Sequence, residues 1–321
     1  MSGKSNSGKI LVISLAILFA IAVYYSSTTI SSNTDFSSPF SFTKSTDKLS
    51  ILVVGDMMLD RNVRNLINKN GFEEFFSGVK ELVSGADIAV ANLEGPFTPY
   101  PSLTASLVNK TLTFTFDPAL APKLSDLGFD ILGLANNHTL NFGREGLEMT
   151  REYVREAGMF YYGDPNNATE LSIITAENGI SVGFVGFHEF TYVNFTKVLE
   201  EIDYLRAQVD VVIVTPHWGE EYQREPTENM KKWAREFIDH GADVVIGSHP
   251  HIVGDIEEYK GRKIFYSLGN FAFDQYFSIG TMNGLGVLMG VEKDKEGKLA
   301  IKYHSVGIRT DRKGVSVVDN P

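Results

Sequence analysis

From position 49 onward, short runs of β-branched and other apolar residues alternate with segments in which apolar residues recur at helical spacing. This alternation is typical of βα units and of a largely parallel sheet. Nearly all of the runs are continuously apolar, which indicates strands that are covered on both faces. The predicted strands are Ser50–Gly55, Asp87–Ala91, Asp130–Ala135, Ser181–Phe187, Asp210–Thr215 and Asp243–Gly247.

Helical patterns fill the intervals between these strands, and Gly128, Gly158 and Gly241 stand where C-terminal caps belong. After Arg262 the pattern changes to hairpin-like strands. We therefore expect a layered α/β domain with a β-rich C-terminal portion. The predicted helices are Phe72–Val83, Ala119–Leu127, Gly143–Ala157, Val198–Gln208 and Glu228–His240, and the late strands are Lys263–Ser267, Gly284–Val291 and Leu299–Val306.

The N-terminal segment predicts export. Lys4 and Lys9 precede an apolar run, and no Lys or Arg follows it closely, which places the N-terminus inside and the remainder outside. The run is short for a spanning helix and overlaps the length of a signal-peptide core, but no clear cleavage site follows Tyr25, so a retained anchor is favoured. The expected organisation is a cytoplasmic N-terminus at 1–9, a transmembrane anchor at 10–25, a flexible linker at 26–47 and an extracytoplasmic domain at 48–321 of a single-pass membrane protein.

Composition excludes several classes of function. The formal net charge of −11, with no basic run, argues against nucleic-acid binding. The same negative field would repel an anionic substrate unless bound cations reverse the sign locally. The chain has no cysteine, so thiolate nucleophiles and Cys-based metal sites are excluded. The Gly-x-Ser-x-Gly elbow and the P-loop motif are also absent, which removes support for serine hydrolases and P-loop nucleotide hydrolases.

Polar clusters follow six of the apolar runs. Since the carboxyl ends of parallel strands lie along one edge of a sheet, we expect the clusters to converge on one rim. Their Asp, Glu and Asn oxygens and neutral imidazoles suit Mn, Fe, Zn or Mg. The clusters are Gly55-Asp56, Asn92-Leu93-Glu94, Asn136-Asn137-His138, His217-Trp218-Gly219, Gly247-Ser248-His249-Pro250-His251 and Ser267-Leu268-Gly269-Asn270.

Each cluster also has a structural interpretation. Asp56 could cap a helix that begins near Arg61, and paired asparagines at 136 and 137 are common turn residues. His249 and His251 could be hydrogen-bonded structural residues, although their spacing puts both imidazoles on one side if the backbone stays extended. Taken together, the structural interpretations need unrelated reasons for such residues to recur at strand ends. His188 also follows a strand, and we rank it below the other candidates.

These clusters resemble the CapA family, which is tied to capsule and poly-γ-glutamate synthesis and is similar in fold to calcineurin-like metallophosphoesterases. The resemblance runs from about Ser50 to about Phe273 in the family's order. It implies a metallophosphoesterase-like layered α/β sandwich behind the N-terminal helix. The matching segments are Gly-Asp-Met-Met-Leu-Asp-Arg (55–61), Ala-Asn-Leu-Glu-Gly-Pro (91–96), Leu-Ala-Asn-Asn-His (134–138), His-Trp-Gly-Glu-Glu-Tyr (217–222), Gly-Ser-His-Pro-His (247–251) and Tyr-Ser-Leu-Gly-Asn-Phe (266–271).

The resemblance also implies roles for single residues. The chain departs from the calcineurin-like pattern at Met58, which stands where the Asp-x-His motif has its histidine, and the bridging carboxylate motif is altered to Asn92-Leu93-Glu94. The implied metal ligands are Asp56, Asn92 or Glu94, Asn137, His217, His249 and His251, with His138 as the catalytic imidazole and Arg61, Asn136 and Asn270 on the rim.

Two functional hypotheses follow. The first is a metal-dependent hydrolase or transferase-like protein that acts at the cell surface on a phosphate ester or an amide-linked anionic polymer, with His138 protonating the leaving group. The second is a non-catalytic polymer-binding or export component of a synthesis complex, with other capsule-synthesis subunits as partners. The presence of His138 favours the first hypothesis, and Met58 favours the second.

Overall fold

The computed structural model describes residues 48–104, 111–168, 170, 172–175, 179–191, 194–294 and 296–318. The predicted anchor at 10–25 and the predicted linker at 26–47 lie outside these residues. Within the described part of the chain, no helix has the length and apolar character that crossing a membrane requires.

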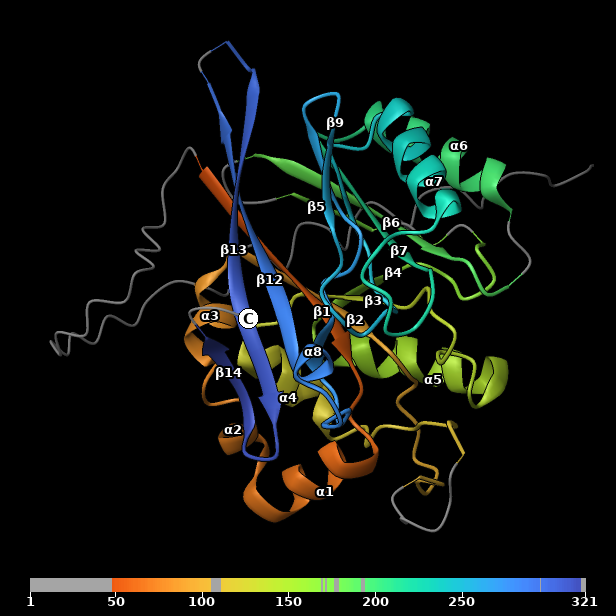
Figure 1. The fold of residues 1–321 in the computed structure, drawn as a ribbon, viewed down its shortest axis with the longest axis vertical. Coiled ribbons are helices and arrows are strands. Elements are labelled where there is room, and N and C mark those ends of the chain that lie inside the picture. Colours follow the sequence, from red (N-terminus) through yellow and green to blue (C-terminus); the bar gives the residue numbers. More distant parts are fainter. Residues whose placement is uncertain are drawn as a thin grey trace, which may run out of the picture. The chain divides into compact units, whose positions relative to one another are not determined.

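The described residues form a mixed α/β sandwich with two sheets (Figure 1). In the larger sheet, the neighbours β1 to β4 are parallel, whereas the three strands from the C-terminal part of the chain are antiparallel to their neighbours. Its strand order is β14 (Gly314–Val318), β13 (Leu299–Asp311), β12 (Asn283–Lys293), β1 (Lys48–Met57), β2 (Ile88–Leu93), β3 (Ile131–Gly133) and β4 (Phe160–Tyr162), and β11 (Asn270–Ala272) also pairs with β1.

The smaller sheet has six strands and a parallel centre. β6, β7, β8 and β10 run parallel to one another, and an antiparallel strand closes each edge. Its order is β5 (Ser172–Thr175), β6 (Ser181–His188), β7 (Val211–His217), β8 (Val244–Ile246), β10 (Arg262–Phe265) and β9 (Ile256–Tyr259). The continuous apolar runs therefore divide between two sheets, and the expectation of one largely parallel sheet is wrong, because a βα pattern does not specify which strands become neighbours.

The sheets face each other across the main core. Side chains from both sheets form one buried apolar cluster, in which Ile51, Val90 and Val287 of the larger sheet meet Phe184 and Ile213 of the smaller one. Strands that are buried by a sheet on one face and by helices on the other need no polar face, which explains the continuous apolar runs.

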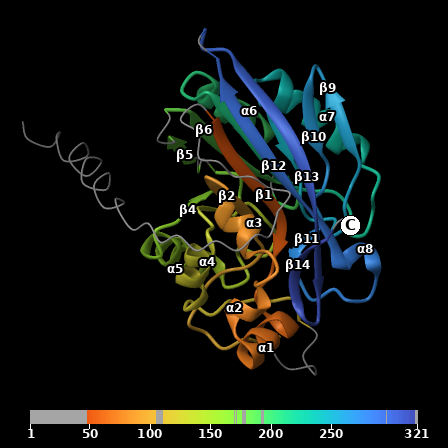
Figure 2. The ribbon, with the colours of Figure 1, turned by 90° about the vertical axis from the view of Figure 1, so that its left-hand side faces the viewer.

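Helices cover the outer faces of the sheets. Figures 1 and 2 show α6 and α7 against the smaller sheet, where they share a second apolar cluster with β6 and β7, and α3 to α5 beside the larger sheet. The helices are α1 (Arg61–Asn70), α2 (Phe72–Phe75), α3 (Lys80–Gly85), α4 (Leu120–Leu127), α5 (Gly143–Glu156), α6 (Phe195–Arg206), α7 (Glu228–Asp239) and α8 (Ile279–Met282).

The predicted helix at Phe72–Val83 is wrong as a single element, because it is divided into α2 and α3. Between them, Gly78 forms an isolated parallel bridge with Ser316 of β14. A Cβ at Gly78 would lie 2.8 Å from the Val315 carbonyl oxygen, so glycine permits this close approach. Tertiary pairing with a distant strand thus interrupts a segment whose local pattern is helical.

Strand β1 changes its neighbour along its length. Its first seven residues pair with β12, the last pair being Val54 with Gly286, and from Asp56 onward it pairs with β11. Gly55 stands at the change, and a Cβ there would lie 1.9 Å from the carbonyl oxygen of Gly269. This crossing brings Asn270 beside Asp56 at the carboxyl end of β1.

Candidate metal centre

The candidate ligands gather where the carboxyl ends of strands from both sheets meet. Asp56 lies on β1 and Glu94 directly follows β2, both in the larger sheet. His217 ends β7 of the smaller sheet, and His249 and His251 follow β8. The predicted rim therefore exists, but two sheets form it rather than one.

One group joins two carboxylates and an imidazole. Ligand atoms of Asp56, Glu94 and His251 all lie within 4.8 Å of one another, and the three side chains are buried. Nε2 of His251 is 3.7 Å from Oε1 of Glu94, and Nδ1 of His251 is 3.3 Å from Oδ2 of Asp56. Among the described residues, neither carboxylate oxygen of Glu94 has a hydrogen-bond partner. Because a buried carboxylate without partners is strongly unfavourable, this group fits a cation that would complete it.

A second group contains two imidazoles and an amide. Nε2 of His217 is 3.0 Å from Oδ1 of Asn137 and 3.2 Å from Nδ1 of His249. Ligand atoms that share one ion at about 2.0–2.2 Å lie roughly 3 Å apart. The separations in this group therefore match those of ligands around a common metal ion.

Burial shifts the two kinds of ligand in opposite directions. It raises the pKa of Glu94 well above its ordinary value, and the nearby charge of Asp56 adds to the effect. It lowers the pKa of His217 well below its ordinary value, and it lowers the pKa of His249 to about 3. The imidazoles are therefore neutral, as metal ligands must be, while Glu94 needs a positive charge nearby to stay ionised.

Two asparagines support the ligands by hydrogen bonds. The Asn92 amide nitrogen donates to Oδ1 of Asp56 at 2.8 Å and lies 3.3 Å from Nδ1 of His217, so it links the two sheets. Asn136 donates to the Asn92 side-chain oxygen at 3.1 Å and to the backbone oxygen of Leu93 at 2.8 Å. In this arrangement Asn92 and Asn136 hold the ligands in place, and Glu94 rather than Asn92 offers free oxygens.

Asn270 orients His251. Its side-chain oxygen lies 3.0 Å from Nδ1 of His251, and its amide nitrogen donates to Oε1 of Gln275 and to the backbone oxygen of Thr281. Since the amide nitrogen is committed elsewhere, its oxygen is the acceptor for Nδ1–H of His251. Nε2 of His251 is then left as the ligand atom that faces Glu94.

His138 lies at the partly exposed edge of the centre. Its Nε2 is 3.9 Å from Oε1 of Glu94, its side chain is 13% exposed, and its ring packs on Phe114 at 4.4 Å. Asn141 lies 3.2 Å from Nδ1 of His138, and burial lowers the pKa of this imidazole while Asn141 opposes the shift. Sequence reasoning missed Asn141, although a polar residue three positions after His138 in a turn was a signal for it.

The His249-Pro250-His251 segment reaches the centre by a different backbone path from the predicted one. His249 and His251 have positive φ angles of 95° and 58°, so the segment is not extended, and the two ring centres are 5.9 Å apart. The one-residue spacing therefore brings both imidazoles together through a strained loop. Such strain is commonly found at functional sites.

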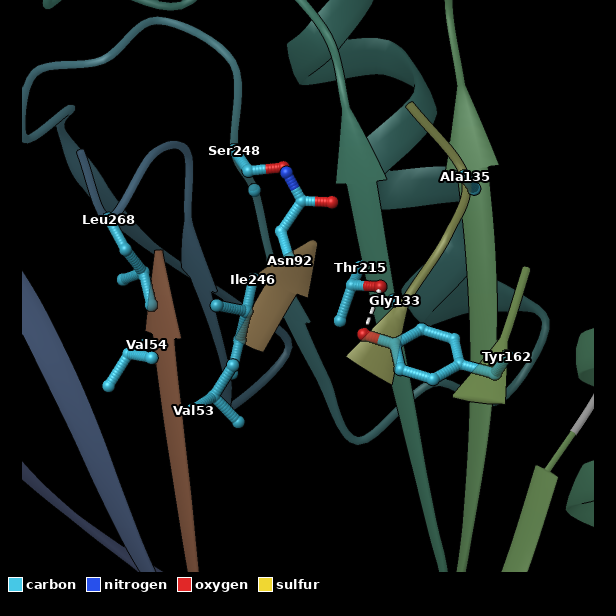
Figure 3. Close-up of a pocket in the computed structure, with 11 residues that line it drawn as sticks. Val53, Val54, Asn92, Gly133, Ala135, Tyr162, Thr215, Ile246, Ser248 and Leu268 are labelled. Carbon is cyan, nitrogen blue, oxygen red and sulfur yellow. Dashed lines mark hydrogen bonds between the residues drawn. The ribbon is translucent and has the colours of Figure 1, made fainter. Parts of the chain in front are cut away.

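A small cavity lies between the sheets beside the ligands (Figure 3). Its volume of about 20 Å³ suits a single water molecule rather than a substrate. On its polar side, the Tyr162 and Thr215 hydroxyls are 2.9 Å apart, and Ser248 Oγ is 2.9 Å from Nδ1 of His217. The cavity is therefore too small to hold a substrate.

Met58 and His188 are two further residues that the sequence singled out. Met58, at the position of the calcineurin-like histidine, is fully buried, and its sulfur accepts the backbone N–H of Asp60 at 3.1 Å. His188 is buried with its ring centre 6.3 Å from that of His217, and its Nδ1 accepts the Phe190 N–H at 3.3 Å. It lines the centre and is not one of the residues in either ligand group.

A family model described as "Bacterial capsule synthesis protein PGA_cap" matches residues 50–275. The chain belongs to this family. It is 30% identical over 249 residues to "Capsule biosynthesis protein CapA" of Bacillus anthracis, covering 71% of this chain and 61% of that protein. It is 29% identical over 252 residues to "PGA biosynthesis protein CapA" of Bacillus subtilis (strain 168), covering 73% and 65%. The chain thus spans less than two thirds of the length of these two relatives.

The PGA_cap match contains all of the candidate ligands and the supporting residues Asn92, Asn136, Asn141 and Asn270. Among solved structures, the chain is similar to the crystal structure of TT1561 from Thermus thermophilus, with 12% identity, a TM-score of 0.42, and coverage of 79% of this chain and 98% of that one. A TM-score this low supports no conclusion about this chain's chemistry.

Proposed function

We propose that this PGA_cap family member is a membrane-anchored accessory protein of capsule or poly-γ-glutamate synthesis, with a metal-dependent site that cleaves or transfers a phosphate ester or an amide-linked anionic polymer. The observation that carries the proposal is Glu94, a buried carboxylate with no hydrogen-bond partner among the described residues, placed between Asp56 and His251. Such a group suits cation binding far better than a structural role.

The residues fit one or two divalent ions. Asp56, Glu94 and His251 would hold the first, and Asn137, His217 and His249 would hold the second. Oxygen and imidazole ligands without sulfur suit Mn, Fe, Zn or Mg. When bound, a divalent ion supplies Lewis-acid chemistry, which draws electron density from the group under attack and makes water more acidic.

The protein's own side chains would supply the proton and the orientation. His138 lies at the open edge, where Nε2 can reach a leaving group, and Asn141 holds its Nδ1. We infer that His138 donates a proton through Nε2, and burial, which lowers the pKa of this imidazole, makes its protonated ring a stronger acid. Asn92 and Asn270 keep the ligands fixed, so little reorganisation is needed when a substrate arrives.

The sequence supports a location of the site outside the membrane. The apolar run at 10–25 with lysines before it supports a retained anchor, with the folded domain outside the membrane and the linker at 26–47 as its tether. We propose that the domain acts at the cell surface beside other synthesis subunits. In a chain of net charge −11, bound cations would allow an anionic polymer to approach.

A second candidate is a non-catalytic polymer-binding or export component, and Met58 favours it. Its side chain is turned toward the backbone of Asp60 and brings no imidazole to the first ligand group. A site with fewer ligands could hold a cation and an anionic polymer without turnover.

The test is metal analysis of the purified full-length chain, followed by hydrolysis assays with aryl phosphate esters and γ-glutamyl peptides. We expect bound divalent metal, and turnover that falls by about 100-fold or more in His138→Ala while the metal content is unchanged. His240→Ala is the matched control, since that imidazole pairs with Asp203 on the surface. If metal is bound but no turnover depends on His138, the non-catalytic binding component is favoured. If no metal is bound, both candidate functions are overturned.

A further inference from the structure

Arg61 lies beside the centre in an unusual conformation. It begins α1 with a φ of 54°, in the left-handed region that residues other than glycine rarely adopt. Its guanidinium carbon lies 5.8 Å from the ring centre of Phe114 and 5.9 Å from that of Phe273. These two rings in turn pack on His138 at 4.4 Å and on His251 at 4.7 Å. The guanidinium is therefore one aromatic ring removed from each imidazole.

Asp274 holds one edge of this guanidinium. Nε of Arg61 donates to Oδ2 of Asp274 at 3.2 Å, and Nη2 lies 2.7 Å from Oδ1. Asp274 is buried and also accepts the backbone N–H of Asn62 at 3.1 Å, so it is itself fixed to the start of α1. A guanidinium has a second edge, formed by Nη1 and Nη2, that can bind another oxyanion in the same two-pronged way.

The second edge of Arg61 is available. Within the described part of the chain, Nη1 makes no hydrogen bond or ion pair, and the side chain is 27% exposed. Arg64, one helical turn further along, is different. Its Nε donates to Oδ1 of Asp60 at 2.8 Å, its Nη2 donates to the backbone oxygen of Thr115, and its side chain is 17% exposed. Arg64 is thus committed to internal contacts, while Arg61 presents a charge toward solvent beside the centre.

A purely structural Arg61–Asp274 pair would not need this arrangement. The pair is partly buried, because the Asp274 side chain is 1% exposed and the Arg61 side chain 27% exposed. Pairing with Asp274 alone does not require a left-handed arginine, which has a backbone cost. The pair, the two rings and the strained backbone together hold the guanidinium rigid, which reduces the entropy lost when a ligand binds.

We propose that Arg61 forms an anion subsite that binds a carboxylate or phosphate group carried by the substrate next to the bond held at the metal centre. The inference rests on the proposed function and narrows its substrate to molecules with a second oxyanion a few bonds from the reacting group. γ-Linked glutamyl chains and pyrophosphate-like esters both have that chemistry. Asp274, Phe114 and Phe273 act as positioning residues for the guanidinium.

The experiment is calorimetric titration of the Mn²⁺-loaded full-length chain in detergent with γ-glutamylglutamate, pyrophosphate and inorganic phosphate. We expect Arg61→Gln to weaken binding of a two-anion probe by about 10-fold to 100-fold, the range for one charge-assisted hydrogen-bonded pair. Binding of inorganic phosphate, which needs the metal ligands alone, should change less than about twofold. The two-anion probe that loses affinity identifies the source of the oxyanion.

Arg61→Lys tests whether a loss of affinity comes from the missing guanidinium or from a misfolded protein. The lysine ammonium can keep the ion pair with Asp274, but it has no second edge that could bind another oxyanion in a two-pronged way. The affinity for the two-anion probes should therefore fall, while the melting temperature stays close to that of the wild type. Arg64→Lys is the matched control, and we expect it to lower the melting temperature without changing probe affinity. Arg61→Gln combined with Asp274→Asn removes both charges and should match the affinity of Arg61→Gln alone.

Equal two-anion affinity in the wild type and both Arg61 variants would overturn the subsite. So would a wild type that binds neither two-anion probe. If the wild type takes up no metal, the proposed function fails, and the same titrations on metal-free protein then decide the subsite separately. Loss of affinity in the Arg61 variants would still support it there, and unchanged affinity would overturn it.

Discussion

The two sheets bring different chemistry to the place where they meet. The larger sheet supplies the carboxylates Asp56 and Glu94, and the smaller sheet supplies the imidazoles His217, His249 and His251. Neither sheet alone carries both the carboxylates and the imidazoles of the candidate centre. The candidate centre therefore forms only where the two sheets pack together. A substitution that loosens this packing would also move the candidate ligands apart.

The same contrast appears in the ionisation of the ligands. Burial raises the pKa of Glu94 and lowers the pKa of His217. Both shifts disfavour charge inside the protein, but only the carboxylate needs charge to bind a metal strongly. A bound cation would therefore stabilise the buried carboxylates of the larger sheet more than the buried imidazoles of the smaller sheet.

Metal removal should have the largest effect, because it affects both sides at once. At free metal several hundred times the dissociation constant, we expect a stabilisation of about 3–4 kcal/mol, or a melting temperature roughly 10 °C higher than with a chelator. Scanning calorimetry of the full-length chain with Mn²⁺ or with EDTA measures this difference. An identical transition in both conditions would argue against a bound ion.

Glu94→Gln tests the carboxylate side. It should lower metal affinity by about 100-fold, and it should make the metal-free protein more stable by about 1–3 kcal/mol, because it removes a buried carboxylate without partners. Metal titration and chelator-treated thermal denaturation measure the two effects. A metal-free variant less stable than the wild type would show that Glu94 has a structural role.

His249→Ala tests the imidazole side and sharpens the contrast. We expect one bound ion fewer per chain, with affinity at the remaining site lower by about 10-fold. The metal-free variant should gain no stability, since a neutral imidazole of pKa about 3 leaves no buried charge to remove. Metal stoichiometry by elemental analysis separates this result from that of Glu94→Gln. A stability gain here would break the contrast between the sheets.

Asp130→Asn should have the smallest effect. It measures the cost of burying a carboxylate at a position away from the candidate metal ligands. Asp130 precedes β3, away from the ligands, and accepts the Ala89 N–H at 2.7 Å. Burial raises its pKa from 3.8 to about 6, so its stabilising contribution is complete below about pH 4 and is lost as pH rises through 6.

The Asp130→Asn variant should thus be more stable than the wild type by about 1–2 kcal/mol at pH 7.5 and equal to it near pH 4. Thermal denaturation with and without chelator checks this, and the gain should not depend on metal. A gain that does depend on metal would mean that Asp130 is coupled to the centre.

Local sequence patterns predict much of this molecule. Six apolar runs predict strands that exist, and the polar residues after them predict side chains that gather at the candidate centre, because both depend on nearest neighbours in sequence. The membership of two sheets was not predictable, because it depends on which strand lies beside which. The helix at 72–83 failed for the same reason, since Gly78 pairs with Ser316 far along the chain.

The contacts that each candidate site residue makes could not be predicted from the sequence either. Arg61 could be placed on the rim, but its partner Asp274 is separated from it by 213 positions, and Phe114 and Phe273 are unremarkable in sequence. Likewise, the family resemblance left Asn92 and Glu94 as alternatives for one role. Their hydrogen bonds distinguish them, because the Asn92 amide is committed to its neighbours and the Glu94 oxygens are not.

The exchange of strand partners at Gly55 has a consequence for how this centre can vary. With the Gly269 carbonyl oxygen 1.9 Å from where a methyl group would stand, even Gly55→Ala must push β11 away from β1. Asn270 would move with β11, and the hydrogen bond that turns His251 toward Glu94 would be lost. A change of one carbon atom, made at a residue with no side-chain chemistry of its own, would therefore act on the centre as a ligand substitution does.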